Sequence, residues 1–189
     1  MCVDVLLIDH FSLGGIKQRL YICGVKSVAI HKNSPISMLF DRKKYLDLLI
    51  EGKGNGLVKI VTGIRRCGKS FLLFTLFRKH LMESGVQEDH IIALAFDDWD
   101  NRQYQNPDRL MEYIKGRMAD CVSLLGVGAS KYYILLDEVQ LLDHFVEVLL
   151  SLMHNPACDI YVTGSNSKFL SSDVVTEFRG RGDEIRVWP

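Results

Sequence analysis

The chain has 189 residues, of which 48% are hydrophobic, and its 23 basic and 23 acidic residues give a formal net charge of zero. This length and apolar content are sufficient to bury one good core, so we expect one main domain with room for an appended segment. The balanced charge excludes recognition of nucleic acid or of an anionic membrane through bulk charge, although a local patch stays compatible with it.

The five cysteines lie far apart and never form a C-x-x-C pair, which argues against a disulfide framework and against a zinc site. A reducing cytoplasm fits this usage best. No apolar run approaches the length needed to cross a membrane. The N-terminus carries Asp4 and Asp9 beside only a short apolar stretch, so it is a poor secretory signal.

Residues 1–37 show the least regular pattern, with two short strand-like runs and no candidate site. We expect them to be an N-terminal extension of uncertain order, followed by the main domain over residues 38–189. Two interpretations of the extension stay open. It packs on the core, or it lies upstream of a natural start near Met38 and is poorly ordered in solution.

A helix is predicted from Asp41 onward, with Tyr45, Leu48 and Leu49 on one face. The glycine-rich residues 51–56 end this helix. They lead into an apolar run over residues 57–62 that predicts a buried strand.

The stretch after this strand fits the pattern G-x-x-x-x-G-K-[S/T], with residues Gly63, Ile64, Arg65, Arg66, Cys67, Gly68, Lys69 and Ser70. In such a phosphate loop, the Walker A motif, glycines let backbone N–H groups approach a triphosphate at the start of a helix. Lys69 supplies a positive charge for the outer phosphates, and the Ser70 hydroxyl is a ligand for Mg²⁺. The order strand, turn, helix distinguishes this loop from an ordinary glycine-rich turn.

Three further elements follow in a regular order. A helix after the loop carries apolar residues at positions 73, 74, 77 and 81, and a second buried strand covers residues 90–96. The acidic residues 97–100 then lie at the carboxyl edge of the sheet and are expected in a solvated loop, with Asp98 as the exception. Asn106 and Pro107 begin another helix, whose core side chains are Leu110, Met111, Ile114, Met118 and Cys121.

A run of five apolar or aromatic residues, 132–136, leads directly into Asp137 and Glu138. Downstream of a phosphate loop, this is the Walker B arrangement, in which the acids lie at the carboxyl end of a central parallel strand and face the loop. Asp137 would hold Mg²⁺ through its water shell. Glu138 would orient and polarise the attacking water.

Asp143 and His144 are expected to cap a helix over residues 145–152, which precedes a strand over residues 159–163. A polar turn follows at the same edge, where a sensor of the γ-phosphate is expected. Asn166 or Ser165 would serve as this sensor. The same residues equally fit an ordinary turn and helix cap.

Two arginines, Arg179 and Arg181, stand around Gly180 just before a final apolar strand. A guanidinium group that reaches the γ-phosphate, from the same chain or from a neighbouring subunit, stabilises transition-state charge. We favour Arg181 over Arg179 for this role. The alternative is a surface salt bridge.

Together these motifs resemble the prokaryotic ATPases of AAA domain family fourteen, on residues 62–70, 133–140, 161–167 and 178–181. The resemblance covers residues 41–189. It implies an AAA+-like P-loop NTPase core, an α/β three-layer sandwich with a mainly parallel sheet in the strand order 5-1-4-3-2. It also implies a C-terminal domain of unknown function that this sequence, ending at Pro189, is expected to lack.

Our hypothesis is a P-loop ATPase that hydrolyses ATP with Mg²⁺, with Glu138, Asn166 and Arg181 as its catalytic residues. A homo-oligomer and a protein or DNA partner are both compatible with it, and no membrane is implied. The alternative is a nucleotide-dependent switch that turns over slowly or not at all. A kinase or GTPase is disfavoured by Glu138 and by the lack of an Asn-Lys-x-Asp guanine reader.

Overall fold

A single parallel sheet organises the part of the chain that the computed structural model describes, residues 42–125, 131–164, 178 and 180–188. Its five strands follow the order β2-β3-β4-β1-β5, and every neighbouring pair is parallel. The strands are β1 (Val58–Gly63), β2 (Ile91–Ala95), β3 (Tyr132–Asp137), β4 (Cys158–Thr163) and β5 (Gly182–Val187). This confirms the predicted fold class and strand order.

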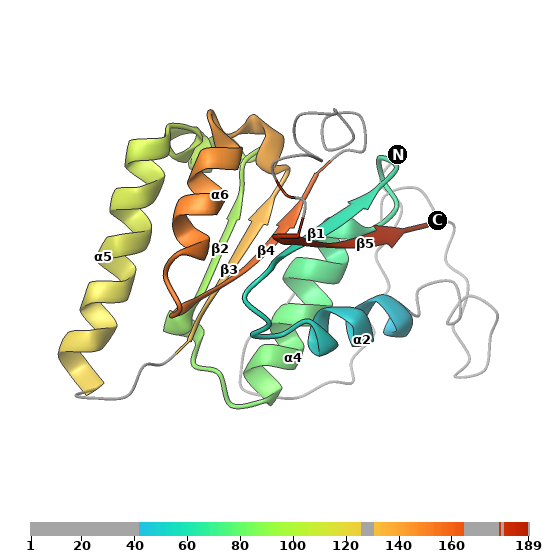
Figure 1. Cartoon of the computed structure of the whole chain (residues 1–189), viewed down its shortest axis with the longest axis horizontal. Coiled ribbons are helices and arrows are strands. Elements are labelled where there is room, and N and C mark those ends of the chain that lie inside the picture. The colour runs from blue at the N-terminus through green and yellow to red at the C-terminus, as the bar shows by residue number, and fades with distance from the viewer. Residues whose placement is uncertain (1–41, 126–130, 165–177, 179, 189) are drawn as a thin grey trace, which may run out of the picture. The chain divides into compact units, whose positions relative to one another are not determined.

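Helices cover both faces of the sheet (Figure 1), so the central strands β1, β3 and β4 are buried along their whole length and are mostly apolar. One face packs on α5 (Pro107–Leu125) and α6 (Phe145–Met153), and the other packs on α2 (Lys43–Glu51) and the helix after the phosphate loop. That helix is continuous and consists of α3 (Lys69–Phe71), the π-helical η1 (Leu72–Phe77) and α4 (Arg78–Glu83). Short 3₁₀ segments are η2 (Glu88–His90), η3 (Trp99–Gln105) and η4 (Val139–Leu141).

The predicted core positions of the helices are largely confirmed. Leu73, Phe77 and Leu81 of the helix after the loop are fully buried, as are Leu110 and Ile114 of α5. Complete burial of such a side chain stabilises the fold by about 2 kcal/mol. The helix therefore holds the loop in place through contacts on the sheet.

Two local predictions were wrong. Leu48 does not face the core, because α2 buries Leu49 and leaves Leu48 39% exposed. The side chain of His144 does not cap α6, since its backbone is left-handed (φ 50°) and it donates or accepts no capping hydrogen bond. A capping side chain needs a short oxygen acceptor and an extended backbone, and His144 has neither.

The predicted extension over residues 1–37, its boundary near Met38 and the side chain of Cys121 lie outside the described residues. In the described part of the chain, no helix combines the length and apolarity that crossing a membrane requires.

Candidate functional site

The phosphate loop connects the carboxyl end of β1 to the amino end of α3. Gly63 has φ 154°, and a Cβ atom there would lie 2.5 Å from the carbonyl oxygen of Val187 and 2.7 Å from Sγ of Cys67. Gly68 immediately precedes α3 with φ 87°, in the left-handed region that a side chain disfavours. The two glycines of the motif are thus required by close approach at one position and by backbone conformation at the other.

Lys69 is only 4% exposed, although it carries a charge. Its Nζ atom donates to the carbonyl oxygens of Gly63 at 3.2 Å and of Ile64 at 3.1 Å, so the amine lies over the loop. Ser70, one residue further on, is exposed. The loop therefore presents one amine and one hydroxyl beside the backbone N–H groups of a helix start, a donor set that fits a polyphosphate.

Arg42 ties this loop to the end of β5, and no sequence motif predicts this contact. Its guanidinium donates to the carbonyl oxygen of Cys67 at 2.6 Å and to that of Trp188 at 2.5 Å. The N–H of Trp188 in turn donates to the Tyr45 hydroxyl at 3.2 Å. The loop is thus held from outside by the first described residue and by the strand that follows β1 in the sheet.

Asp137 ends β3 and Glu138 follows it directly, two strands away from the loop. Asp137 is 4% exposed, and its Oδ1 atom accepts a hydrogen bond from the hydroxyl of Thr163 at the end of β4. The same hydroxyl oxygen accepts the backbone N–H of Glu138 at 3.1 Å. Thr163 was missed as a site residue, since a threonine at the end of a strand carries no signal until the strand order is known.

Glu138 is half-buried and has a left-handed backbone, with φ 52° and ψ 46°. Non-glycine residues adopt this conformation rarely, and it often marks a functional position. Its carboxylate accepts a hydrogen bond from the side-chain amide of Gln140. The two acids of the motif therefore lie in different surroundings, one buried against Thr163 and the other at the surface of the sheet edge.

The acids after β2 do not join this arrangement. Asp97, Asp98 and Asp100 are exposed, and Asp98 accepts the N–H of Asp100 at 3.1 Å as the cap of η3. This agrees with a solvated loop, in which the side chain of Asp98 caps η3.

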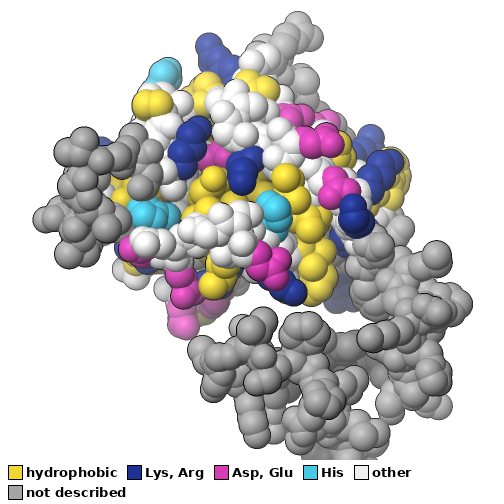
Figure 2. All heavy atoms as spheres, turned by 90° about the horizontal axis from the view of Figure 1, so that it is seen from below, with side chains coloured by type: hydrophobic (Ala, Val, Ile, Leu, Met, Phe, Trp, Pro, Cys, Tyr) yellow, Lys and Arg dark blue, Asp and Glu magenta, His cyan; other side chains and the backbone are white. Residues whose placement is uncertain are grey.

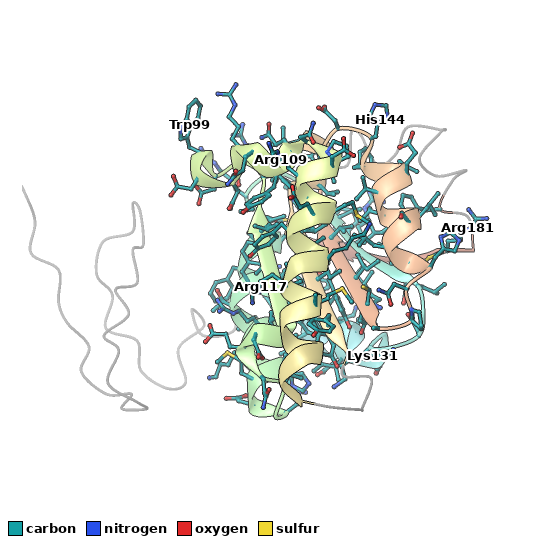
Figure 3. The ribbon with its side chains drawn as sticks, turned by 90° about the vertical axis from the view of Figure 1, so that its left-hand side faces the viewer. Trp99, Arg109, Arg117, Lys131, His144 and Arg181 are labelled. Carbon is teal, nitrogen blue, oxygen red and sulfur yellow. The ribbon has the colours of Figure 1, made fainter. Side chains whose placement is uncertain are left out.

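Of the residues predicted to sense or stabilise the γ-phosphate, Arg181 lies in the described part of the chain. Ser165, Asn166 and Arg179 lie outside the described residues. Arg181 is exposed and lies at the amino edge of the sheet. It directly precedes Gly182, the first residue of β5, which pairs with Val58, the first residue of β1. The carboxyl end of β1 is about 16 Å away along the strand. In Figure 3 the Arg181 side chain projects outward, so a role toward the loop of its own chain does not fit this geometry.

An open groove of about 670 Å³ lies elsewhere, between the amino ends of α5 and α6. Its lining includes the carboxylates of Asp108, Asp143 and Glu147. These negative charges would repel a polyphosphate, so we place the candidate site at the phosphate loop and not in this groove.

The described residues contain no group of three or more His, Cys, Asp or Glu side chains that could hold a metal ion. A hydroxyl and a carboxylate, with waters and phosphate oxygens, are nevertheless the oxygen ligands that Mg²⁺ accepts. Figure 2 shows basic and acidic side chains interspersed on one face of the molecule.

The family model AAA_14, described as an AAA domain, matches residues 55–189. An uncharacterized protein of Haemophilus influenzae is 29% identical over 151 residues, which make up 80% of this chain and 36% of that protein. An uncharacterized protein of Methanocaldococcus jannaschii is 25% identical over 132 residues, 70% of this chain and 26% of the relative. The chain thus spans about a third or less of each relative's length.

A chain from the structure of Drosophila ORC bound to DNA is similar in fold, with a TM-score of 0.52 and 11% sequence identity. The likeness covers 82% of this chain and 93% of that one. At this identity it concerns the fold alone.

Proposed function

Because the chain belongs to the AAA_14 family of AAA domains, we propose that it binds ATP and hydrolyses it to ADP and phosphate. One observation carries this proposal. The amine of Lys69 and the carboxylates of Asp137 and Glu138 stand at the same edge of one parallel sheet, with Thr163 of the intervening strand bonded to both acidic residues.

In this proposal the loop from Gly63 to Ser70 holds the phosphates. Its backbone N–H groups and the dipole of the following helix favour negative charge. Lys69 moves from the carbonyl oxygens of Gly63 and Ile64 to the outer phosphates, which offer it a full negative charge in place of two dipoles.

Ser70 and Asp137 would hold Mg²⁺, directly or through its water shell. The ion supplies positive charge to the phosphate oxygens when it is bound. Thr163 keeps one carboxylate oxygen of Asp137 hydrogen-bonded, which fixes the direction of the other.

Glu138 accepts a proton from the attacking water or polarises it, as general-base catalysis requires. Asn166, or Ser165, is proposed as the polar sensor near the γ-phosphate. Arg181 is proposed to act on the site of a neighbouring copy, because it lies at the opposite edge of its own sheet. The proposed active form is therefore a homo-oligomer.

The test is steady-state Mg-ATP hydrolysis by the full chain, with ATP binding measured separately by calorimetry. We expect Lys69→Ala to lose binding and turnover, and Glu138→Gln to keep binding and lose turnover. Lys131→Ala is the matched control, since this exposed lysine precedes β3 at the opposite edge (Figure 3) and should change neither. Tight ATP binding without turnover in the parent would instead support the switch function.

A partner is the second part of the proposal. The ORC structure with a similar fold is bound to DNA, so duplex DNA is one class of ligand to test, and a protein is the other. DNA binding that depends on ATP and is lost in Lys69→Ala would support duplex DNA as the partner. No DNA binding in either nucleotide state would leave a protein partner.

A further inference from the structure

The turn after β3 presents the side chains of Glu138 and Gln140 together. The N–H of Leu141 donates to the carbonyl oxygen of Glu138 at 3.0 Å, and that of Leu142 donates to Val139 at 3.0 Å. Val139 and Leu142 are buried in the core between the sheet, α5 and α6. Their burial fixes a tight turn in which alternate residues, 138 and 140, stay at the surface of the site.

The side-chain amide of Gln140 donates from Nε2 to Oε2 of Glu138. The reverse orientation of the amide would set its carbonyl oxygen against a carboxylate oxygen, two acceptors without a proton between them. The amide therefore has one allowed orientation here. Its Oε1 atom is buried and accepts no hydrogen bond from the residues that the structure describes.

This contact differs from the one that Thr163 makes. Thr163 binds the backbone N–H of Glu138 and so holds the main chain. Among the described contacts, the hydrogen bond that the Glu138 carboxylate accepts comes from Gln140. The direction of the carboxylate thus depends on a side chain only two positions further on.

We propose that Gln140 is a positioning residue, which holds Oε2 of Glu138 and leaves its Oε1 free for the attacking water. This inference rests on the proposed hydrolysis. A carboxylate held by one oxygen loses the rotations that would turn it away from the water. Displacement of a catalytic group by about 1 Å can cost as much as a hundredfold in rate.

Two variants separate positioning from packing. Gln140→Met keeps the length and volume of the side chain but removes the donor, and Gln140→Glu keeps the shape but replaces the donor with a charged oxygen. We expect each to lower kcat by roughly ten- to a hundredfold. The ATP dissociation constant should stay within about twofold of the parent value, because the hydrogen bond of Gln140 to Glu138 acts on the attack by water, after ATP has bound.

The matched control is Gln105→Met. Gln105 is another half-buried glutamine, whose side chain donates to the backbone oxygen of Phe96 at 2.8 Å and makes no hydrogen bond to Glu138 among the described contacts. It should lower the melting temperature without lowering kcat.

The outcomes are distinct. A kcat within twofold of the parent in both Gln140 variants overturns the positioning role. A loss of ATP affinity as large as the loss of kcat would also overturn it, since the contact would then serve ATP binding. A collapse of the melting temperature in both variants would overturn it as well, since the contact would then serve folding. A parent chain that binds ATP without turnover refutes the proposed hydrolysis itself, and this role for Gln140 falls with it.

Discussion

The backbone N–H of Glu138 donates a hydrogen bond to Oγ1 of Thr163, which lies 3.1 Å away and 25 residues further along the chain. The same hydroxyl donates to the carboxylate of Asp137. One side chain of β4 therefore fixes both acidic residues of β3. Its single proton can satisfy only one acceptor, and it is directed to the buried carboxylate, where an unpaired charge would cost most.

The first prediction concerns this hydroxyl. Thr163→Val keeps the shape of the side chain and removes the hydrogen bonds, so Asp137 and the N–H of Glu138 both lose a partner. We expect a loss of about 1–3 kcal/mol in the free energy of unfolding and a marked fall in kcat. Thr163→Ser keeps the hydroxyl and should retain most of both quantities. Urea denaturation and ATP hydrolysis measure them, and a valine variant as active as the serine variant would contradict the prediction.

The second prediction concerns the loop. Gly63→Ala places a Cβ atom 2.5 Å from the backbone oxygen of Val187, so the loop or β5 must shift. We expect ATP binding to be lost and the melting temperature to fall. Gly56→Ala is the control, because Gly56 also has a positive φ, 77°, but its Cβ would meet no atom within 4 Å. It should cost only about 1 kcal/mol of backbone strain and leave ATP affinity unchanged. Similar affinities in the two variants would contradict the close approach.

The third prediction tests the role of Arg181 between copies. Arg181→Ala should bind ATP like the parent and lose at least about a hundredfold in turnover. Mixing this protein with the Lys69→Ala protein, which is expected to bind no ATP but still carries Arg181, should restore part of this activity. Arg109→Ala serves as control, since Arg109 is exposed and pairs with Glu112 on the surface of α5. Absence of recovery on mixing would argue against action between copies.

The fourth prediction concerns the buried ion pair of Lys59 and Asp159 at the amino edge of the sheet. Burial lowers the pKa of Lys59, although the charge of Asp159 opposes this. Asp159 also accepts the N–H of Gly54 and the Tyr161 hydroxyl, each at 2.9 Å. Asp159→Ala leaves a buried charge unpaired and should cost about 3–5 kcal/mol of stability.

Asp47→Ala is the control for this pair. It removes an exposed pair with Lys43 on α2 and should cost less than about 1 kcal/mol. Urea denaturation measures both variants. Equal stability losses would show that the buried pair contributes no more than a surface one.

The fifth prediction concerns pH. Burial raises the pKa of Cys158 to about 11 from 9.0, with a further contribution from the charge of Asp159. The thiol ionises first in the unfolded chain, so the stability that it contributes is complete below pH 9 and is lost as the pH rises toward 11. Between these values the parent should lose about 2 kcal/mol more than Cys158→Ala. Thermal melts of both proteins under reducing conditions measure this difference, and parallel curves would contradict it.

The sequence by itself determined the local features of this protein. The phosphate loop, the strands that flank it, the acidic end of β3 and the alternation of strands and helices all depend on neighbours within a few positions. Their residue types and spacing are visible in the chain because backbone geometry and phosphate chemistry impose them locally. The strand order came from the resemblance to a family and not from the pattern of apolar residues.

The tertiary structure alone decided which distant side chains meet. Arg42 and Trp188 are 146 positions apart, and Lys59 and Asp159 are 100 apart. The first contact depends on the pairing of β5 with β1, because Trp188 follows β5. The second contact, like that of Thr163 with Glu138, requires the pairing of β4 with β1 and β3. The position of Arg181 at the edge opposite the loop follows from the parallel register of β5. All strands of a parallel sheet end at the same edge. Strand order and register, and not distance along the chain, therefore decide which residues become neighbours in space.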